Sequence, residues 1–324
     1  MIADRVLVDD WHVVANSADL PEGKILAARL LGEDLVLWRS GGQAVAWKDL
    51  CPHRGSRLSL GTVQGGTLAC PYHGWRYAPD GQCVRVPSDP NVAPPSRARA
   101  TTYRVEEHYG FVWVSLGEPT HGVPPFAEWS QPGFRKIPAG PYYMRANAFR
   151  ALENFIDATH FPFVHPGVLG NPDNMDRVDD FTTSVDAEGL HTSEIRIWPN
   201  EADEARKRPA RGYNAYTYSC FRPLTACVAR MPDEASRYCV FVNITPVDET
   251  QCILWIRLAL NFDQQVPDEE LVRRQDRITA QDVPIVESQR PAALPLDLQA
   301  ELHVRADKLA VAYRRWLQEL GVAG

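Results

Sequence analysis

The sequence predicts an α+β fold in two parts: an N-terminal all-β domain, then an α+β domain in which helices flank an antiparallel sheet. Short apolar runs separated by turns that contain Gly and Pro fill the first third of the chain, which is typical of a small β-sandwich or barrel. Residues 117–141 are rich in Pro and Gly, so we expect a boundary there, with domains at 1–118 and 119–324. Strand-like and helix-like runs both follow, and such a mixture favours helices packed beside a sheet.

The individual elements follow from the spacing of apolar residues and from turn and capping signals. In the first domain, strands are expected at Trp11–Ala15, Ile25–Leu31, Leu35–Trp38, Ala44–Trp47 and Phe111–Val114. In the second domain, strands are expected at Tyr213–Cys220, Arg237–Thr245 and Gln251–Asn261. Helices are expected from Asn147 past His160, from Pro267 through Asp282, and over Leu298–Leu320.

The composition excludes several classes of function. The 324 residues carry a net charge of −7, which disfavours a protein that coats nucleic acid or an anionic membrane. No apolar run reaches the ~20 residues of a membrane span, and no secretory signal is visible, so we expect a cytoplasmic protein. The seven cysteines are an odd number, which argues against a disulfide framework.

Two loops of the first domain carry the strongest chemical signal. They are Cys51-Pro52-His53-Arg54-Gly55 and Cys70-Pro71-Tyr72-His73-Gly74-Trp75. Each loop offers one thiolate and one imidazole, whereas a zinc finger groups its cysteines and histidines separately. The mixed loops suit a [2Fe–2S] cluster of the Rieske type, in which two cysteines bind one iron and two histidines the other. A structural zinc site with the same four ligands is the alternative.

A second group of metal-binding residues lies in the second domain, in the segment from Asn154 to His165. His160 and His165 are five residues apart and would diverge on a regular helix. Pro162 lies between them, and a helix that breaks there can direct both rings to one point. Two histidines and one carboxylate form the facial triad of non-haem Fe(II) oxygenases. By spacing alone, Asp276, Asp282 and Glu287 are all candidates for the carboxylate.

With both motifs in one chain, the sequence resembles the Rieske non-haem iron oxygenases. It is most similar to their homotrimeric group, which includes vanillate and dicamba O-demethylases, toluenesulfonate methyl monooxygenase and hydroxylases of saxitoxin-type alkaloids. The resemblance extends from Trp11–Ala15 to Ala312–Leu317 and includes Leu35–Ser40. It implies a Rieske cluster in the first domain and a mononuclear Fe(II) in a catalytic second domain.

The resemblance also implies roles that spacing leaves open. It favours Asp282 over Asp276 and Glu287 as the third iron ligand. It implies that Asp157 bridges His160 to His73 of the adjacent subunit, so that electrons cross between protomers. It further implies that Asn154 lies close to the iron without being a firm ligand.

The implied reaction is hydroxylation of a C–H bond, with O- or N-demethylation where the attacked carbon bears an ether oxygen or an amine. The substrate is expected to be small and aromatic or heterocyclic, with O₂ as co-substrate. Electrons would come from NAD(P)H through a separate reductase that contains flavin and a ferredoxin domain. An aromatic-ring cis-dihydroxylating dioxygenase and a non-catalytic Rieske electron carrier are the alternatives.

The sequence also offers three arginines for binding an anionic substrate group. They lie in or near expected strands of the second domain, where an inward guanidinium can hold a carboxylate or sulfonate. They are Arg222, Arg230 and Arg257.

Overall fold

The computed structural model forms two compact units, Met1–Val123 and Pro124–Gly324. The division falls in the Pro- and Gly-rich segment of the sequence, a few residues after the expected boundary at 118. Among the described residues, no helix is both long enough and apolar enough to cross a membrane. The structure describes residues 4–166, 168–169, 179–198 and 212–322.

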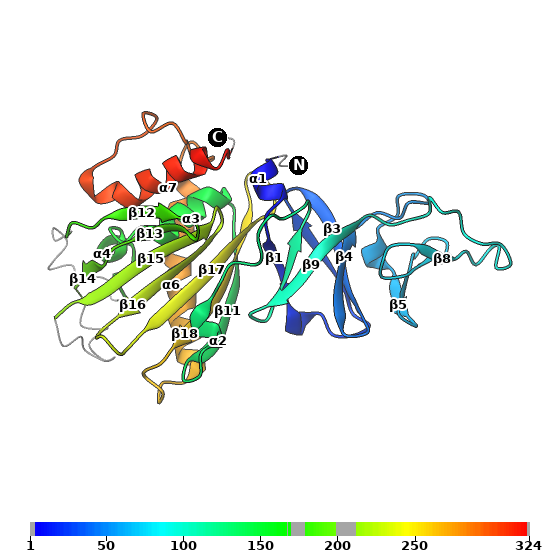
Figure 1. Cartoon of the computed structure of the whole chain (residues 1–324), viewed down its shortest axis with the longest axis horizontal. Helices are drawn as coiled ribbons and strands as arrows, with labels where there is room; N and C mark the ends of the chain where they lie inside the picture. The colour runs from blue at the N-terminus through cyan, green and yellow to red at the C-terminus, as the bar shows by residue number, and fades with distance from the viewer. Residues whose placement is uncertain (1–3, 167, 170–178, 199–211, 323–324) are drawn as a thin grey trace. The chain divides into compact units, whose positions relative to one another are not determined.

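The first unit contains a six-stranded antiparallel sheet with the strand order β1-β10-β9-β4-β3-β2 (Figure 1). A short helix, α1 (Arg5–Val8), precedes it. All five strands expected from the sequence in this unit are confirmed within a few residues. The sheet strands are β1 (His12–Asn16), β2 (Ile25–Leu30), β3 (Glu33–Ser40), β4 (Gln43–Lys48), β9 (Thr102–His108) and β10 (Phe111–Ser115).

A smaller four-stranded sheet, with the order β5-β6-β7-β8, holds the two Cys-His loops. Trp38, Trp47 and Tyr77 pack below the loops in a core that also contains Cys51 and Cys70. These large side chains anchor the loops, because loops of this size bury little apolar surface of their own. The elements of this region are η2 (Leu58–Leu60), β5 (Thr62–Gln64), β6 (Thr67–Ala69), β7 (Arg76–Tyr77) and β8 (Cys83–Arg85).

The second unit is built on an antiparallel sheet with the order β11-β18-β17-β16-β15-β13-β12, and β14 pairs with β15 (Figure 1). Helices cover it, as the expected α+β class requires. α3 packs on β16, β17 and β18, and α6 packs on β11. The strands are β11 (Arg135–Met144), β12 (Thr183–Asp186), β13 (Gly189–Thr192), β14 (Ile195–Ile197), β15 (Asn214–Arg222), β16 (Thr225–Met231), β17 (Tyr238–Pro246) and β18 (Cys252–Leu260).

The helices differ from the sequence prediction at their ends. The expected helix beyond Asn147 ends at Ile156 instead of continuing past His160. The helix from Pro267 extends beyond Asp282 to Ser288 and contains Pro284 in its interior. The last helix begins ten residues later than expected, at Lys308 rather than Leu298, after a single 3₁₀ turn, η4 (Arg305–Asp307). The helices are α2 (Ala127–Ser130), α3 (Ala148–Ile156), α4 (Phe161–Val164), α6 (Asp268–Ser288) and α7 (Lys308–Glu319).

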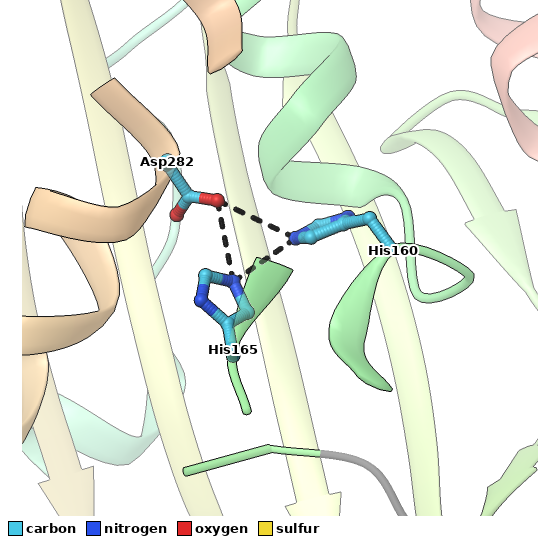
Figure 2. Close-up of side chains that lie close together, drawn as sticks. All are labelled: His160, His165 and Asp282. Atoms are coloured by element: carbon cyan, nitrogen blue, oxygen red, sulfur yellow. Dashed lines mark hydrogen bonds and ion pairs between the residues drawn. The ribbon is translucent and has the colours of Figure 1, made fainter. Parts of the chain in front are cut away.

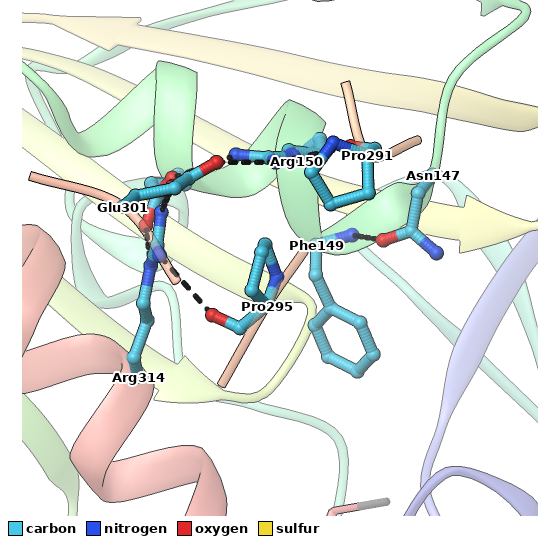
Figure 3. A network of polar contacts seen from close by, with 8 residues as sticks. Asn147, Phe149, Arg150, Pro291, Pro295, Glu301 and Arg314 are labelled. Carbon is cyan, nitrogen blue, oxygen red and sulfur yellow. Dashed lines mark hydrogen bonds and ion pairs between the residues drawn. The ribbon is translucent and has the colours of Figure 1, made fainter. Parts of the chain in front are cut away.

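A buried ion network fixes α3 against α7 (Figure 3). The guanidinium of Arg314, on α7, binds both carboxylate oxygens of Glu153, on α3, at 2.6 and 2.8 Å. The same group binds Glu301 at 2.6 Å, and Glu301 binds Arg150 at 2.7 Å. Both arginines are buried, so each depends on these carboxylates for charge compensation. The network holds α3 one residue before Asn154, where the candidate metal-binding segment begins.

This network predicts a large stability difference between two neighbouring arginines. Arg314→Met leaves Glu153 without its main partner, and an uncompensated buried charge costs about 3 kcal/mol. We expect the free energy of unfolding, measured by urea denaturation, to fall by that amount. Arg315→Met is the matched control, because Arg315 is exposed and its removal costs less than ~0.5 kcal/mol. Equal stability of the two variants would contradict the structural importance of the network.

Candidate metal centres

The two Cys-His loops have the same backbone conformation. In each loop the glycine N–H donates to the carbonyl of the cysteine four residues earlier: Gly55 to Cys51 at 2.9 Å, and Gly74 to Cys70 at 3.0 Å. Each cysteine N–H in turn donates to the carbonyl five residues later, at 2.8 Å in both loops. Gly55 and Gly74 have φ values of +70° and +69°, a region that favours glycine. The sequence repeat therefore produces two matched loops.

The histidines of the two loops lie next to each other. The ring centroids of His53 and His73 are 4.7 Å apart, and Trp75 stacks on His53 at 4.2 Å with an angle of 8° between the planes. Partial burial, together with His73 and Arg54, lowers the pKa of His53. A lowered pKa keeps the imidazole neutral, which is the form that binds metal.

The cysteines of the loops lie deeper than the histidines. Cys51 and Cys70 are buried, whereas His73 is exposed. The Tyr77 hydroxyl lies 3.2 Å from Cys51 Sγ, and burial together with this contact raises the pKa of Tyr77. The hydroxyl therefore stays protonated and can donate to a Cys51 thiolate. The arrangement fits a cluster with one iron on the sulfur side and the other on the exposed nitrogen side.

The second group of residues is brought together by a helix break earlier than expected. α3 ends at Ile156, and Asp157 is its extended C-cap residue. Pro162 does not break a helix but lies in the first turn of α4, a position that tolerates proline because its missing N–H has no helical partner there. The chain therefore turns between Asp157 and His160, and α4 then presents His165.

Figure 2 shows three side chains whose ligand atoms converge: His160, His165 and Asp282. The two Nε2 atoms are 3.1 Å apart, and Asp282 Oδ1 lies 3.5 Å from that of His160 and 3.2 Å from that of His165. Three ligands on one octahedral face, with metal–ligand bonds of about 2.1 Å, are separated by about 3.0 Å. The observed separations are close to this value, so the residues fit a metal with facial geometry.

The other nitrogen of each ring meets an acceptor. His160 Nδ1 lies 3.2 Å from Asp157 Oδ2, and His165 Nδ1 lies 3.1 Å from Gln281 Oε1. Both Nδ1 atoms therefore donate a hydrogen bond, which leaves the Nε2 lone pairs free to bind metal. The sequence analysis did not identify Gln281, although its position beside Asp282 in the chain is a signal that could have indicated it.

The electrostatics of this group favour a cation. Burial alone would raise the pKa of Asp282, but its hydrogen bonds with His160 and His165 outweigh burial and lower it. Burial likewise opposes a charge on His160, but Asp157 and Asp282 raise its pKa to about 9. Without a metal, His160 is therefore protonated and its positive charge is balanced by the carboxylates of Asp157 and Asp282. A divalent metal that binds there replaces this proton.

The other sequence candidates lie in different places. Asn154 Nδ2 approaches Asp282 Oδ1 at 3.4 Å, next to the three converging residues. Asp276 instead accepts a hydrogen bond from the Tyr142 hydroxyl, and Glu287 pairs with Arg145. Of the three carboxylates that sequence spacing left as candidate ligands, Asp282 is therefore the one that lies with His160 and His165.

Two cavities adjoin His160. One, of about 90 Å³, is lined mostly by apolar and aromatic side chains of the sheet, α3 and α6, with Arg230, Gln275, Thr279 and Asp282 among the polar groups. The other, of about 310 Å³, is lined by Asp157 together with residues such as Trp198 and His303. Of the three candidate arginines, Arg230 lines the first cavity. Arg257 instead lies over the Trp129 ring, and Arg222 Nη1 donates to the Phe221 carbonyl.

Comparison with known proteins identifies both halves of the chain. The Rieske [2Fe-2S] domain matches residues 10–97, and the vanillate O-demethylase oxygenase C-terminal domain matches residues 144–323. The methylxanthine N1-demethylase NdmA of Pseudomonas putida is 34% identical over 327 residues, which cover 96% of this chain and 88% of that protein. The solved structure of Pseudomonas putida NdmA with caffeine matches with a TM-score of 0.86 and 32% identity, covering 97% of this chain and 91% of that chain.

A third relative matches about a third of the chain. The oxidoreductase NdmD of Pseudomonas putida is 43% identical over 118 residues, 36% of this chain and 20% of that protein. The matches confirm the predicted resemblance, and with it a Rieske [2Fe–2S] cluster and a mononuclear iron as cofactors. The chain belongs to the Rieske non-haem iron oxygenases, as an oxygenase component with a vanillate O-demethylase type C-terminal domain.

Proposed function

We propose that this monooxygenase demethylates a small N-methyl heterocycle or aryl methyl ether. The observation that carries the proposal is the lining of the cavity that reaches His160 and Asp282, which is walled by Phe155, Phe161 and Tyr216 among others. Aromatic and aliphatic walls with few polar groups suit a planar ring. The methylxanthine demethylases among its relatives act on substrates of this kind.

The reaction balances with one O₂ and one NAD(P)H for each methyl group. One oxygen atom enters the methyl C–H bond, and the other leaves as water. The hydroxymethyl compound then loses formaldehyde and leaves an N–H or O–H group on the ring. The cluster supplies single electrons and the iron supplies O₂ activation. The chain's own contribution is to orient the methyl group and to exclude water from the cavity.

We assign Cys51, Cys70, His53 and His73 as the cluster ligands. The matched loops, the neighbouring imidazoles and the buried cysteines support this assignment. One cysteine and one histidine in each loop, instead of the separate pairs of a zinc finger, also support iron over the alternative structural zinc site.

Tyr77→Phe tests the environment of the assigned cluster. A hydrogen bond to Cys51 Sγ is stronger when the reduced cluster places more negative charge on sulfur, so it raises the reduction potential. If the hydrogen bond stabilises the reduced cluster by about 1 kcal/mol more than the oxidised cluster, its loss should lower the reduction potential by about 40 mV. Spectroelectrochemical titration measures this change. Tyr103→Phe, in β9 of the same unit, is the control and should leave the potential unchanged. An unchanged potential in Tyr77→Phe would show that the hydroxyl does not donate to the cluster.

We assign His160, His165 and Asp282 as the ligands of the mononuclear iron, with Asn154 beside them. The separations of their ligand atoms and the Nδ1 partners of both rings support this assignment. These three groups would hold the iron and leave coordination positions for O₂ and substrate, which suits an oxygenase.

Asp282→Asn is expected to lose the mononuclear iron and to keep the cluster. An asparagine oxygen carries no charge and binds Fe(II) more weakly than a carboxylate. Metal analysis should give about two irons per chain instead of about three, with the EPR signal of the reduced cluster unchanged. Asp276→Asn, on the same helix, should keep about three. Retention of the third iron by Asp282→Asn would refute the ligand assignment.

We further propose a homotrimer in which Asp157 connects His160 to the cluster of a neighbouring copy through the neighbour's His73. Asp157 supports this because its side chain is 36% exposed and lines the 310 Å³ cavity while it contacts His160. Leu302, also in that cavity wall, is 99% exposed, as expected for a residue that another subunit covers. A separate reductase with flavin and a ferredoxin domain is the proposed electron donor. None of the seven cysteines, all of which the structure describes, forms a disulfide, and this supports the expected cytoplasmic compartment.

The proposed reaction is tested with the reconstituted protein, a surrogate reductase and a panel of N-methyl heterocycles and aryl methyl ethers. We expect equal amounts of formaldehyde, O₂ consumed and NAD(P)H oxidised with a true substrate. With ¹⁸O₂, one labelled atom should enter the organic products, and Asp282→Asn should be inactive. Two labelled atoms in a ring diol would instead establish the dihydroxylase alternative. An electron carrier would contain no third iron.

A further inference from the structure

The two imidazole rings of the mononuclear site have different partners behind them. His160 Nδ1 faces the carboxylate of Asp157, a charged acceptor, whereas His165 Nδ1 faces the amide oxygen of Gln281, a neutral acceptor. The first contact is within the 157–165 segment, but the second joins residues 116 positions apart in the chain. Through Gln281, α6 therefore contacts His165 at Nδ1, the ring nitrogen that does not face Asp282.

Consecutive residues of α6 contact both nitrogen atoms of the same ring. Asp282 Oδ1 lies 3.2 Å from His165 Nε2, and Gln281 Oε1 lies 3.1 Å from its Nδ1. Neighbouring residues on a helix point about 100° apart, so the longer glutamine side chain is needed to reach around the ring. His165 itself is 1% exposed, and water has little access to replace the glutamine.

We propose that Gln281 is a positioning residue for the mononuclear iron, which holds His165 in the tautomer that presents Nε2 to the metal without adding a charge. The inference rests on the proposed ligand assignment. A metal-binding histidine needs an acceptor for its second N–H, because that bond fixes the tautomer and the ring orientation. The amide oxygen satisfies this need.

The neutral amide also keeps the site balanced in charge. Fe(II) carries two positive charges, and the carboxylates of Asp157 and Asp282 compensate both of them. A third carboxylate at 281 would leave an excess negative charge in a largely buried site, which favours the divalent metal but disfavours the empty protein. The amide oxygen of Gln281 therefore accepts the hydrogen bond from His165 Nδ1 without adding a negative charge.

Two substitutions separate the geometric role from the charge. Gln281→Met keeps the length of the side chain but removes the acceptor, and Gln281→Glu keeps the acceptor and adds a charge. Arg277→Met is the matched control, because it places the same new residue on an exposed position of α6. The probe is Co²⁺ or Fe²⁺ binding to the full chain with its cluster in place and the mononuclear site emptied, measured by competition with a chelator.

We expect Gln281→Met to weaken metal binding about 10-fold to 100-fold. Gln281→Glu should bind as tightly as the parent or more tightly, and Arg277→Met should bind as the parent does. The melting temperature of metal-free Gln281→Met should stay close to that of the parent. A purely structural role would lower that temperature, and the glutamate would not restore the affinity.

Unchanged metal affinity in Gln281→Met would overturn the inference, as would a loss of affinity that Gln281→Glu fails to restore. If Asp282→Asn has lost the iron while Gln281→Met retains full affinity, the ligand assignment stands and only the role of Gln281 fails. If neither substitution affects the metal, the ligand assignment itself is wrong.

Discussion

The proposed mononuclear iron site depends on the convergence of three lone pairs that the chain must bring together from two distant segments. His160 and His165 come from the turn after α3 and from the end of α4, and Asp282 comes from the middle of α6. In the absence of metal a proton on His160 holds these groups together, because the lone pairs of two imidazole nitrogens and a carboxylate would otherwise repel one another. The site therefore needs rigid supports on both sides.

The supports are polar contacts behind each proposed ligand and a buried ion network behind α3. Asp157 and Gln281 contact the two rings, and Asn154 contacts Asp282. Arg314 ties Glu153 to Glu301 and thereby holds α3 against α7. A buried ion pair contributes little net stability compared with apolar packing, but it is demanding in geometry. It is thus well suited to holding the last turn of α3, from which the ligand segment leaves, in one position.

The first unit holds its two Cys-His loops in place mainly through backbone hydrogen bonds rather than through side-chain contacts. Its two loops repeat one hydrogen-bonding pattern, and their glycines adopt the positive φ that this pattern requires. Buried cysteines below and more exposed histidines above would make a cluster held by these loops asymmetric toward solvent. That asymmetry suits electron exchange through the imidazole edge, while Trp75 covers one face of His53.

The sequence alone indicated the fold class, the family resemblance, the two Cys-His loops and the two histidines of the second candidate site. These follow from local patterns: short punctuated strands, two loops of the same composition, and two histidines spaced about a proline. Sequence spacing did not locate the helix ends around the second site, because Pro162 can either break a helix or begin one, and only packing decides between these. The turn falls between Asp157 and His160, and α6 continues through Pro284.

Spacing left open which carboxylate faces the histidines, the resemblance favoured Asp282, and only the tertiary structure shows where all three carboxylates lie. Asp276, Asp282 and Glu287 occupy one helix, and the sequence does not specify which of its sides packs toward α3. The structure directs Asp276 to Tyr142 and Glu287 to Arg145 and leaves Asp282 with the histidines. Gln281 and the Arg314 network emerged in the same way. The physical reason is that a hydrogen bond between residues more than a hundred positions apart leaves no periodic signal in the sequence.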